Sequence, residues 1–295
     1  MLSVKLDELR NLLRSYGSCL VAYSGGVDSV FLARTAHDAL GHRALAVIAD
    51  SPSLPRRELD AALEIARTFD FPVRVIRTSE FDNPDYLSNP ANRCYFCKHE
   101  LFEVLKPLAA TEGFAVIAYG ENASDVGDFR PGAQAAKEFQ VRAPLKEIGL
   151  TKVEIRELSA QLGLPTADKP QMACLSSRLP YGEPVTEEKL RMIESAENVL
   201  RDLGFRDVRV RHHTLKSRLP ASDTEIATHL ARIELGVVEI PQLLANGATA
   251  RVAKALEGIG YAHVTLDLLG YRRGSANEVL SARTPQPGNL PVKES

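Results

Sequence analysis

The sequence has no apolar run long enough to span a membrane. A helical span needs about 20 uninterrupted apolar residues, and no segment of this 295-residue chain approaches that length. The opening stretch, MLSVKLDELRNLL, carries acidic residues where a secretory signal would not. We therefore expect a protein that stays in the cytoplasm.

A strong net charge is also missing. The 36 Lys and Arg residues nearly balance the 38 Asp and Glu residues, which leaves a net charge of -2. The chain as a whole therefore has no general attraction to nucleic acids or anionic membranes, and such a role would need a local basic patch. The hydrophobic content of 44% is ordinary for a globular protein, and the length favours one large and one smaller domain.

The sequence does contain a series of short apolar strands separated by helical segments. The first strand runs directly into an S-G-G-V-D-S string at residues 24–29, and a helical stretch follows to about Leu40. Four such strands are expected, at residues 19–23, 44–49, 73–77 and 115–119. This alternation predicts an α/β fold with a doubly wound parallel sheet.

The organisation of the chain changes after this alternation. A polar loop with several prolines covers residues 168–184, and we place the domain boundary in it. Residues 1–180 would form the first domain and residues 185–280 a smaller α+β domain. The elements expected in the second domain are a helix at 186–203, strands at 205–213 and 229–235, a helix at 240–258 and a strand at 261–268. The tail, residues 283–295, has three prolines and few apolar residues and is expected to be disordered.

The 24–29 string has the chemistry of a phosphate-binding loop. Gly25 and Gly26 let the backbone turn tightly and approach a ligand, and the exposed N–H groups attract an anion together with the positive end of the following helix. Ser24 and Ser29 can donate hydroxyl hydrogen bonds. Asp28 alone would repel phosphate, so its presence indicates a divalent cation such as Mg²⁺ that bridges it to the phosphates. The string lacks the Walker A lysine and the G-x-G-x-x-G spacing.

The S-G-G-V-D-S string after an apolar strand resembles the signature of the PP-loop ATP pyrophosphatases. This superfamily cleaves ATP between its α and β phosphates and adenylates its substrate. The resemblance implies that ATP and Mg²⁺ bind here, that adenine lies beside the strand ending at Asp50, and that the segment 120–125 joins the nucleotide site. The residues it assigns to ATP are Ser24, Gly25, Gly26, Asp28, Ser29, Asp50, Asn122 and Asp125, with Asp128 and Arg130 following.

Adenylyl transfer requires cations beyond Mg²⁺. The reaction builds negative charge on the α-phosphate and on the departing pyrophosphate, and loop amides, Mg²⁺ and at least one basic side chain must stabilise that charge. The candidates are Lys98, Arg130 and Arg178. The alternative for each of them is an ordinary solvated surface charge.

A C-x-x-C pair, Cys94 and Cys97, opens a second candidate site. It lies at the expected start of a helix, where the helix N-terminus and the nearby Arg93 and Lys98 would lower the thiol pKa values and favour thiolates. In a reducing compartment, a close pair indicates metal or redox chemistry more often than a disulfide.

The two remaining cysteines differ from each other. Cys174 lies in the boundary loop, whereas Cys19 lies within the first strand and is expected to be a small buried hydrophobic residue. Cys174 and the C-x-x-C pair allow three interpretations: a [4Fe–4S] cluster with one iron free of protein ligands, a zinc site completed by a histidine such as His99, or a redox pair with a sulfur-carrying cysteine. Spacing alone does not decide among them.

Further motifs resemble the LarE-type sulfur transferases, which act in the biosynthesis of the nickel-pincer nucleotide cofactor. The motifs are N-R-C-Y-F-C-K at 92–98, A-C-L-S-S-R at 173–178 and V-R-H-H at 210–213, and the similarity runs from about residue 6 to residue 280. The resemblance implies that ATP adenylates a carboxylate of pyridinium biscarboxylic acid mononucleotide, and that sulfur then displaces AMP to give a thiocarboxylate. Members with one cysteine sacrifice the sulfur of the residue matching Cys174. The added Cys94 and Cys97 resemble the members whose three cysteines hold a [4Fe–4S] cluster.

The second domain carries a basic cluster on one strand and the loop after it. Its members are Arg206, Arg209, Arg211, His212, His213, Lys216 and Arg218. Strand alternation would place Arg209, Arg211 and His213 on one face, where they could hold the phosphate of a mononucleotide. The resemblance adds Ser177 and Glu234 to this set. The alternatives are RNA binding and a plain charged strand face.

The leading hypothesis is therefore an ATP-dependent sulfur transferase with a small-molecule nucleotide substrate and no nucleic-acid or membrane partner. The resemblance also suggests a homo-oligomer such as a hexamer, and the segment 215–227 is longer than the matching family loop. A tRNA thiolase would share the chemistry but needs an RNA-binding surface. An amide-forming ligase would use ammonia in place of sulfur. A non-catalytic binding module is a third alternative, which the many ATP-site residues disfavour.

Overall fold

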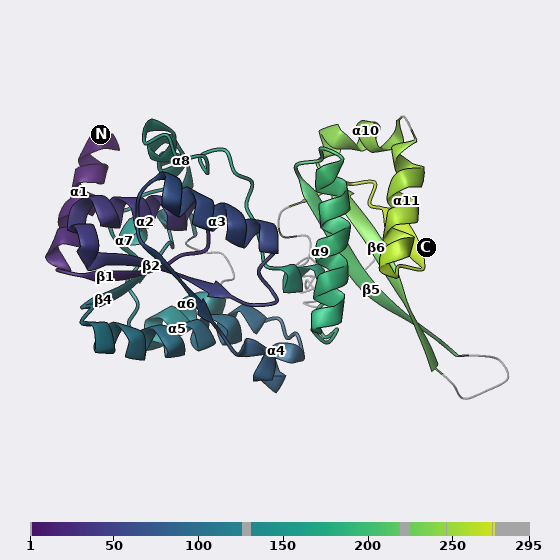
Figure 1. Ribbon diagram of the computed structural model, residues 1–295, viewed down its shortest axis with the longest axis horizontal. Coiled ribbons are helices and arrows are strands. Elements are labelled where there is room, and N and C mark those ends of the chain that lie inside the picture. The colour runs from purple at the N-terminus through teal and green to yellow at the C-terminus, as the bar shows by residue number, and fades with distance from the viewer. Residues whose placement is uncertain (1, 126–130, 219–224, 246, 273, 275–295) are drawn as a thin grey trace, which may run out of the picture. The chain divides into compact units, whose positions relative to one another are not determined.

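The structure, a computed structural model, describes residues 2–125, 131–218, 225–245, 247–272 and 274 of the chain (Figure 1). These residues divide into two compact units, which are described separately. The large unit comprises Met1–Ser176 and Tyr181–Leu190, and the small unit comprises Ser177–Pro180 and the chain from Arg191 onward. None of the described helices is long and apolar enough to cross a membrane.

The large unit is built on a four-stranded parallel sheet. Its strands are β1 (Cys19–Ala22), β2 (Ala44–Asp50), β3 (Val73–Arg77) and β4 (Val116–Tyr119), in the spatial order β3-β2-β1-β4. β1 is central, because Leu20 lies opposite both Leu45 of β2 and Ile117 of β4. The predicted α/β parallel sheet is confirmed. Its winding reverses between β1 and β4, which is where ligands bind in folds of this kind.

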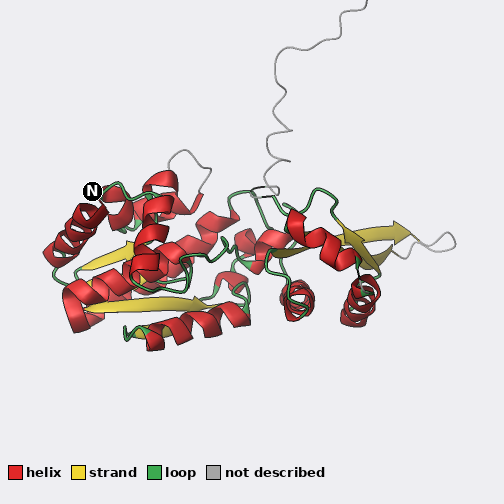
Figure 2. Cartoon of the chain, turned by 90° about the horizontal axis from the view of Figure 1, so that it is seen from above, coloured by secondary structure: helices red, strands yellow, loops and turns green. Residues whose placement is uncertain are grey.

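Helices cover both faces of this sheet (Figure 2). They are α1 (Leu2–Ser15), α2 (Val27–Leu40), α3 (Arg56–Thr68), α4 (Pro84–Leu87), α5 (Arg93–Glu112), α6 (Pro131–Glu138), α7 (Pro144–Glu147) and α8 (Lys152–Gln161). One apolar cluster contains residues of α1, α2, α3 and α8, and another contains residues of α5 and α6. The sheet therefore separates two helical layers.

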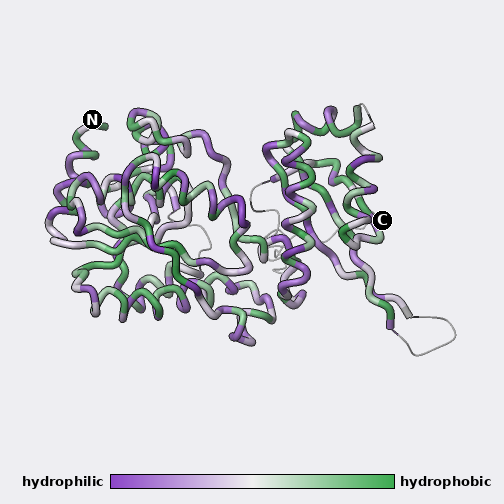
Figure 3. The backbone as a smooth tube through the Cα atoms, in the orientation of Figure 1, coloured by the Kyte–Doolittle hydropathy of each residue, from purple (hydrophilic) through white to green (hydrophobic). Residues whose placement is uncertain are grey.

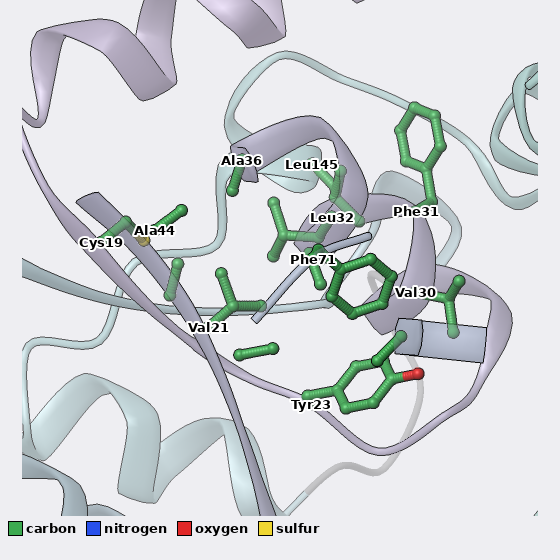
Figure 4. Packing of buried hydrophobic residues seen from close by; sticks show 14 of the residues in the cluster. Cys19, Val21, Tyr23, Val30, Phe31, Leu32, Ala36, Ala44, Phe71 and Leu145 are labelled. Carbon is green, nitrogen blue, oxygen red and sulfur yellow. The ribbon is translucent and has the colours of Figure 1, made fainter. Parts of the chain in front are cut away.

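The pleat of β1 divides its side chains between these two layers. Cys19 and Val21 belong to the cluster with α2, whereas Leu20 and Ala22 belong to the cluster with α5. Figure 4 shows Cys19 and Val21 among the side chains of the first cluster. All four residues are buried, which explains why the strand reads as a continuous apolar run. Cys19 is the small buried residue that its position predicted.

The small unit contains a three-stranded sheet in the order β5-β6-β7. β5 (Val208–Arg218) pairs antiparallel with β6 (Glu225–Leu235), and β6 pairs parallel with β7 (His263–Leu266). The helices are α9 (Glu187–Asp202), α10 (Ile240–Leu244) and α11 (Ala248–Ile259). Apolar residues of these elements form a core of their own, and hydrophobic stretches of the tube run through the strands in Figure 3.

Two elements of the small unit differ from the prediction. β5 and β6 extend to Arg218 and from Glu225, well beyond the expected strands, because backbone pairing continues after the buried side chains end. The helix expected at 240–258 is two helices, and Gly247 lies between them with a left-handed φ of 68°. Part of the segment 215–227, the tail 283–295, Asp128 and Arg130 lie outside the described residues.

Candidate active site

The phosphate loop between β1 and α2 is held by its own hydroxyl groups. Ser29 Oγ accepts a hydrogen bond from the Ser24 N–H (3.1 Å) and donates to the Gly26 carbonyl (3.0 Å). Gly25 has φ of 71°, in the left-handed region that favours glycine. A Cβ at Gly25 would lie 2.7 Å from Cβ of Ala62 on α3, so α3 packs directly against the loop. The result is a tight turn at a helix N-terminus, a geometry suited to binding phosphate.

A cavity of about 410 Å³ opens beside this loop. Its volume lies in the range of small-molecule sites. The phosphate loop, the ends of β2 and β4, and the first turns of α5 and α6 form its wall. The predicted site residues on that wall are Ser24, Gly26, Asp28, Ser29, Cys94 and Lys98. The loop expected to bind ATP and the helix that carries the C-x-x-C pair therefore share one cavity.

Asp28 forms an ion pair that the sequence did not predict. Lys152 Nζ lies 2.6 Å from Asp28 Oδ2, although the two residues are far apart in the chain. Lys152 begins α8, where Thr151 and Glu154 form a capping box that fixes the start of the helix. The capping box is visible in the sequence and places Lys152 at a helix start, but nothing in the sequence relates that start to the phosphate loop.

The segment after β4 packs closely against the phosphate loop and is shaped by its own hydrogen bonds. A Cβ at Gly120 would lie 3.0 Å from the backbone nitrogen of Ser29, so this segment approaches the phosphate loop closely. The Ser124 N–H donates to Asn122 Oδ1 (2.9 Å), and the Asn122 N–H donates to Asp125 Oδ2 (3.2 Å). Asn122 and Asp125 are both buried. They shape the turn of this segment from within and are not on the cavity wall.

Two acidic residues at strand ends have basic partners. Asp50, at the end of β2, is paired with Arg56 of α3. Glu121, which lines the cavity, lies 2.8 Å from Lys146 Nζ and also accepts a hydrogen bond from the Tyr119 hydroxyl. Glu121 was not predicted as a site residue, and it places a carboxylate on the wall after β4.

The three cysteines of the candidate sulfur site lie close enough for their charges to interact. Cys94 and Cys97 are in the first turns of α5, and Cys174 is in the loop of the large unit that precedes Leu175. Burial raises the pKa of the Cys97 thiol, and the charges of Glu80, Cys174 and Cys94 raise it further. Desolvation also raises the pKa of the Cys94 thiol, with Cys174 as the next cause.

The expected lowering of these two thiol pKa values is therefore wrong. Lys98 lowers the pKa of both Cys94 and Cys97, and Arg93 lowers that of Cys94, as the sequence suggested. At the half-buried Cys97, desolvation has the larger effect and favours the neutral thiol, whereas Cys94 is exposed. Sequence neighbours reveal nearby charges but not the burial that outweighs them.

Buried polar contacts fasten the chain immediately after Cys174. The Leu175 N–H donates to the Ser53 carbonyl (2.8 Å), and Ser176 Oγ lies 2.9 Å from Ser53 Oγ and 2.8 Å from the Tyr86 hydroxyl. Arg93, the first residue of α5, donates through Nη1 to the Ser176 carbonyl (3.0 Å). Ser53, Tyr86 and Arg93 are buried and were not predicted as part of this site, and they bring the Cys174 loop to the start of α5.

Three thiols fit an iron–sulfur cluster in the kind of ligand they supply. Among the side chains that the structure describes, no three Cys, His, Asp or Glu residues form a ready metal-binding group. Cluster binding would have to deprotonate the half-buried Cys97 thiol, whose pKa is raised by desolvation. His99, the zinc candidate, has Nδ1 3.5 Å from Glu103 and packs edge-to-face against Phe139.

Two predicted arginines of the small unit form buried ion pairs: Arg178, a candidate for charge stabilisation in adenylyl transfer, and Arg211, a candidate for phosphate binding. Arg178 is fully buried and makes a two-pronged hydrogen bond with Glu197 (2.8 and 3.1 Å). Arg211 does the same with Glu234 (3.0 and 2.9 Å). Arg178 thus belongs to the small unit together with its carboxylate partner.

Arg209 adds a further cation to this network. Its guanidinium lies 4.8 Å from the ring centre of Tyr271. Burial lowers the pKa of Arg209, and repulsion from Arg178 lowers it further. Arg211 also donates to the Ser177 carbonyl (2.8 Å), so Ser177, Arg209, Arg211 and Glu234 lie in one small region. A bound phosphate would relieve the repulsion between the arginines.

The fold and cavity together define a class of protein. A parallel sheet whose winding reverses between β1 and β4 carries an S-G-G-V-D-S phosphate loop at that point, with Asp28 and Lys98 on the same cavity wall. This arrangement is that of an ATP-using enzyme of the PP-loop pyrophosphatase superfamily.

Comparison with known proteins identifies the family. The chain is 32% identical over 281 residues to the pyridinium-3,5-bisthiocarboxylic acid mononucleotide synthase of Lactiplantibacillus plantarum, covering 95% of this chain and 96% of that protein. It is 43% identical over 281 residues to an uncharacterized protein of Synechocystis sp., covering 95% and 100%. A GMP synthase of Lactobacillus gasseri is more distant, at 26% identity over 68% of this chain and 42% of its own. No family model matches. The chain belongs to the LarE family of ATP-dependent sulfurtransferases.

Proposed function

We propose that this enzyme adenylates a carboxylate of a pyridinium mononucleotide and then replaces AMP with sulfur to form a thiocarboxylate. The observation that carries the proposal is the shared cavity, whose wall holds Ser24 and Asp28 of the phosphate loop beside Cys94 and Lys98 of the cysteine helix. The product named for the Lactiplantibacillus plantarum relative is a bisthiocarboxylic acid mononucleotide, which is the chemistry proposed here.

The first half-reaction needs the phosphate loop and its neighbours. A carboxylate oxygen of the substrate attacks the α-phosphorus of ATP, the bond from that phosphorus to the bridging oxygen breaks, and pyrophosphate leaves. Loop N–H groups and Lys98 would stabilise the negative charge that develops. Mg²⁺ held by Asp28 would neutralise charge on the phosphates. Lys152, now paired with Asp28, would be released toward the same phosphates when the cation arrives.

The second half-reaction needs the cysteines. Sulfur forms a bond to the acyl carbon of the adenylate, the carbon–oxygen bond to AMP breaks, and AMP leaves with that oxygen. Cys94, Cys97 and Cys174 would hold a [4Fe–4S] cluster, which when bound would supply sulfur at the oxidation level of sulfide. Arg93 is positioned to hold the Cys174 loop at the start of α5 through its bond to the Ser176 carbonyl.

The small unit carries the residues proposed to bind a phosphate group. Arg209 and Arg211 are the proposed phosphate ligands, with Ser177 beside them and Glu234 orienting Arg211 through its two-pronged bond. The guanidinium fork matches a phosphate as well as it matches a carboxylate. Assembly of several copies as a homo-oligomer is part of the same proposal, by likeness to the family.

The test is an anaerobic assay of protein reconstituted with iron and sulfide, which supply the sulfur, together with ATP, Mg²⁺ and pyridinium biscarboxylic acid mononucleotide. We expect pyrophosphate and AMP to form together with a product whose mass reports exchange of one oxygen for sulfur. Cys174→Ala should abolish the sulfur-containing product while pyrophosphate is still released. Cys19→Ala, which alters a cysteine buried in β1, is the matched control and should behave as the wild type.

A different result would favour an amide-forming ligase, in which ammonia takes the place of sulfur. If Cys174→Ala retained full product formation with ammonia as the co-substrate, the sulfur proposal would fail and an amide-forming ligase would replace it. Iron and acid-labile sulfide contents of protein reconstituted without oxygen, compared with those of Cys94→Ala and Cys97→Ala, test the cluster separately.

A further inference from the structure

A short turn upstream of Cys174 is fastened to the phosphate loop. Lys169, in the turn of residues 166–169, has Nζ 3.1 Å from the Gly25 carbonyl and 2.6 Å from a carboxylate oxygen of Glu58. The side chains of Lys169 and Glu58 are both mostly buried. Glu58 belongs to the first turn of α3, the helix that packs against the loop at Gly25. One lysine thus links the loop that carries Cys174 to the loop proposed to bind phosphate.

The same turn is braced by α8. Arg156 donates through its two terminal nitrogens to the carbonyls of Ala167 and Lys169. The Lys169 N–H closes the turn on the Thr166 carbonyl at 3.0 Å. The turn next to Lys169 is therefore held by α8 as well as by the phosphate loop and Glu58, and the chain continues from it to Cys174.

Cys174 lies between this fastening and a second one. Downstream, Leu175 is bonded to Ser53 at 2.8 Å. Cys174 itself is only half-buried. The placement of its thiol consequently depends on the contacts that hold the loop on either side of it. The upstream contact is the one from Lys169 to the phosphate loop.

The bond from Lys169 reaches a peptide group that faces the ligand site. The Gly25 carbonyl and the Gly26 N–H belong to the same peptide unit, and Gly26 lines the cavity. A cation at the carbonyl polarises the peptide and makes the N–H a stronger donor to an anion. Phosphate at that N–H strengthens the bond from the lysine in return, because coupling between two sites is reciprocal.

We propose that Lys169 is a positioning residue that couples occupation of the phosphate loop by ATP to the placement of the loop carrying Cys174. The proposal rests on the function proposed above. When ATP binds, the bond from Lys169 to the phosphate loop becomes stronger and holds the Cys174 loop in place. Activation of the substrate therefore precedes delivery of sulfur.

The experiment measures the alkylation rate of Cys174 in the full-length protein before any cluster is reconstituted, with and without a nucleotide. The probe is α,β-methylene ATP with Mg²⁺, which cannot be cleaved between the α and β phosphates, and mass spectrometry of the Cys174 peptide reports the rate with iodoacetamide. Binding of the analogue is measured separately by calorimetry. In the wild type, we expect saturating analogue to slow alkylation by about fivefold, at the low end of usual coupling.

The Lys169→Met variant separates coupling from shielding of the thiol by the nucleotide. It should still bind the analogue, weakened by about the coupling factor, but the analogue should leave its Cys174 alkylation rate unchanged. Lys146→Met is the matched control, since Lys146 also pairs with an acidic residue beside the cavity, Glu121. The control should keep the wild-type ratio of rates.

Three results would overturn the proposal. An unchanged ratio in Lys169→Met would mean that the nucleotide shields the thiol directly, and an unchanged rate in the wild type would mean that no coupling exists. Loss of analogue affinity by far more than the coupling factor in Lys169→Met would make Lys169 a ligand of the nucleotide. Failure of the wild type to bind the analogue would instead contradict the proposed ATP site itself.

Discussion

The phosphate loop and Cys94 of the cysteine site line one cavity, but the two sites are built in different ways. The loop is local: residues 24–29 are consecutive, and Ser24 and Ser29 bond to each other across the turn. The cysteine site joins two segments that are distant in the chain, and the buried residues Arg93 and Tyr86 hold them together. Backbone conformation determines the first site and packing of side chains the second.

This difference has a functional consequence. A loop made of backbone donors keeps its shape over many substitutions around it, provided that Gly25 and the start of α2 are preserved. A site assembled by buried polar contacts depends on each of them, because an unsatisfied buried group costs free energy. Substitutions should therefore affect adenylation and sulfur transfer separately, and the following predictions test that separation.

The largest effect is expected for Asp28→Asn. Without the carboxylate, Mg²⁺ loses its proposed ligand, and pyrophosphate formation should fall by about 10²–10³. Stopped assays of pyrophosphate release check this. Asp38→Asn, on the same helix and paired with Arg34, is the control and should retain activity. Loss of activity in both variants would show that the helix, and not the metal ligand, is at fault.

Gly25→Ala should come next. The new Cβ would meet Ala62 at 2.7 Å in a backbone region unfavourable for alanine, which should lower the free energy of unfolding by about 1–3 kcal/mol. Denaturant unfolding and nucleotide binding are the measurements, with Gly149→Ala as control because Gly149 has a similar φ of 70° and open space. Equal losses in the two variants would contradict the role of contact with α3.

Ser176→Ala should have a smaller and selective effect. It removes hydrogen bonds to Ser53 and Tyr86, and about 1 kcal/mol of stability should be lost. Thiocarboxylate formation should fall while pyrophosphate release stays near the wild-type rate. A parallel fall of both rates would break the distinction between the two sites.

The smallest effect concerns an ion pair outside both sites. The pKa of Glu154 is lowered from 4.5 to about 2, mainly by the hydrogen bond from Lys5 and next by the one from the Thr151 backbone. The ion pair therefore stabilises the fold above pH 4.5, the ordinary pKa of Glu154, and this stabilisation is lost as the pH falls through about 2. Lys5→Met should cost about 0.5 kcal/mol at neutral pH, and the difference from wild type should vanish in strong acid. Unfolding curves over pH check this, and a difference that persisted in acid would assign the loss to packing.

The sequence predicts what is local and periodic. The strands of the large unit and the phosphate loop could be placed because apolar runs and the S-G-G-V-D-S string are continuous in the chain. The contact of Lys152 with Asp28 and the contact of Ser53 with Ser176 could not be predicted, since tertiary packing alone brings these residues together. The raised pKa of Cys97 was missed for the same reason: its partial burial is a property of the fold, and the adjacent Lys98 suggested the opposite direction.

The most direct test of sequential adenylation and sulfur transfer uses a substrate whose carboxylate carries a heavy oxygen isotope. Attack on the α-phosphorus followed by displacement at the acyl carbon moves one carboxylate oxygen to AMP. Mass spectrometry should therefore find one heavy oxygen in AMP, while the other carboxylate oxygen stays in the thiocarboxylate. AMP without the heavy isotope, formed together with thiocarboxylate, would show that the carboxylate is not activated by adenylation and would contradict the proposed chemistry.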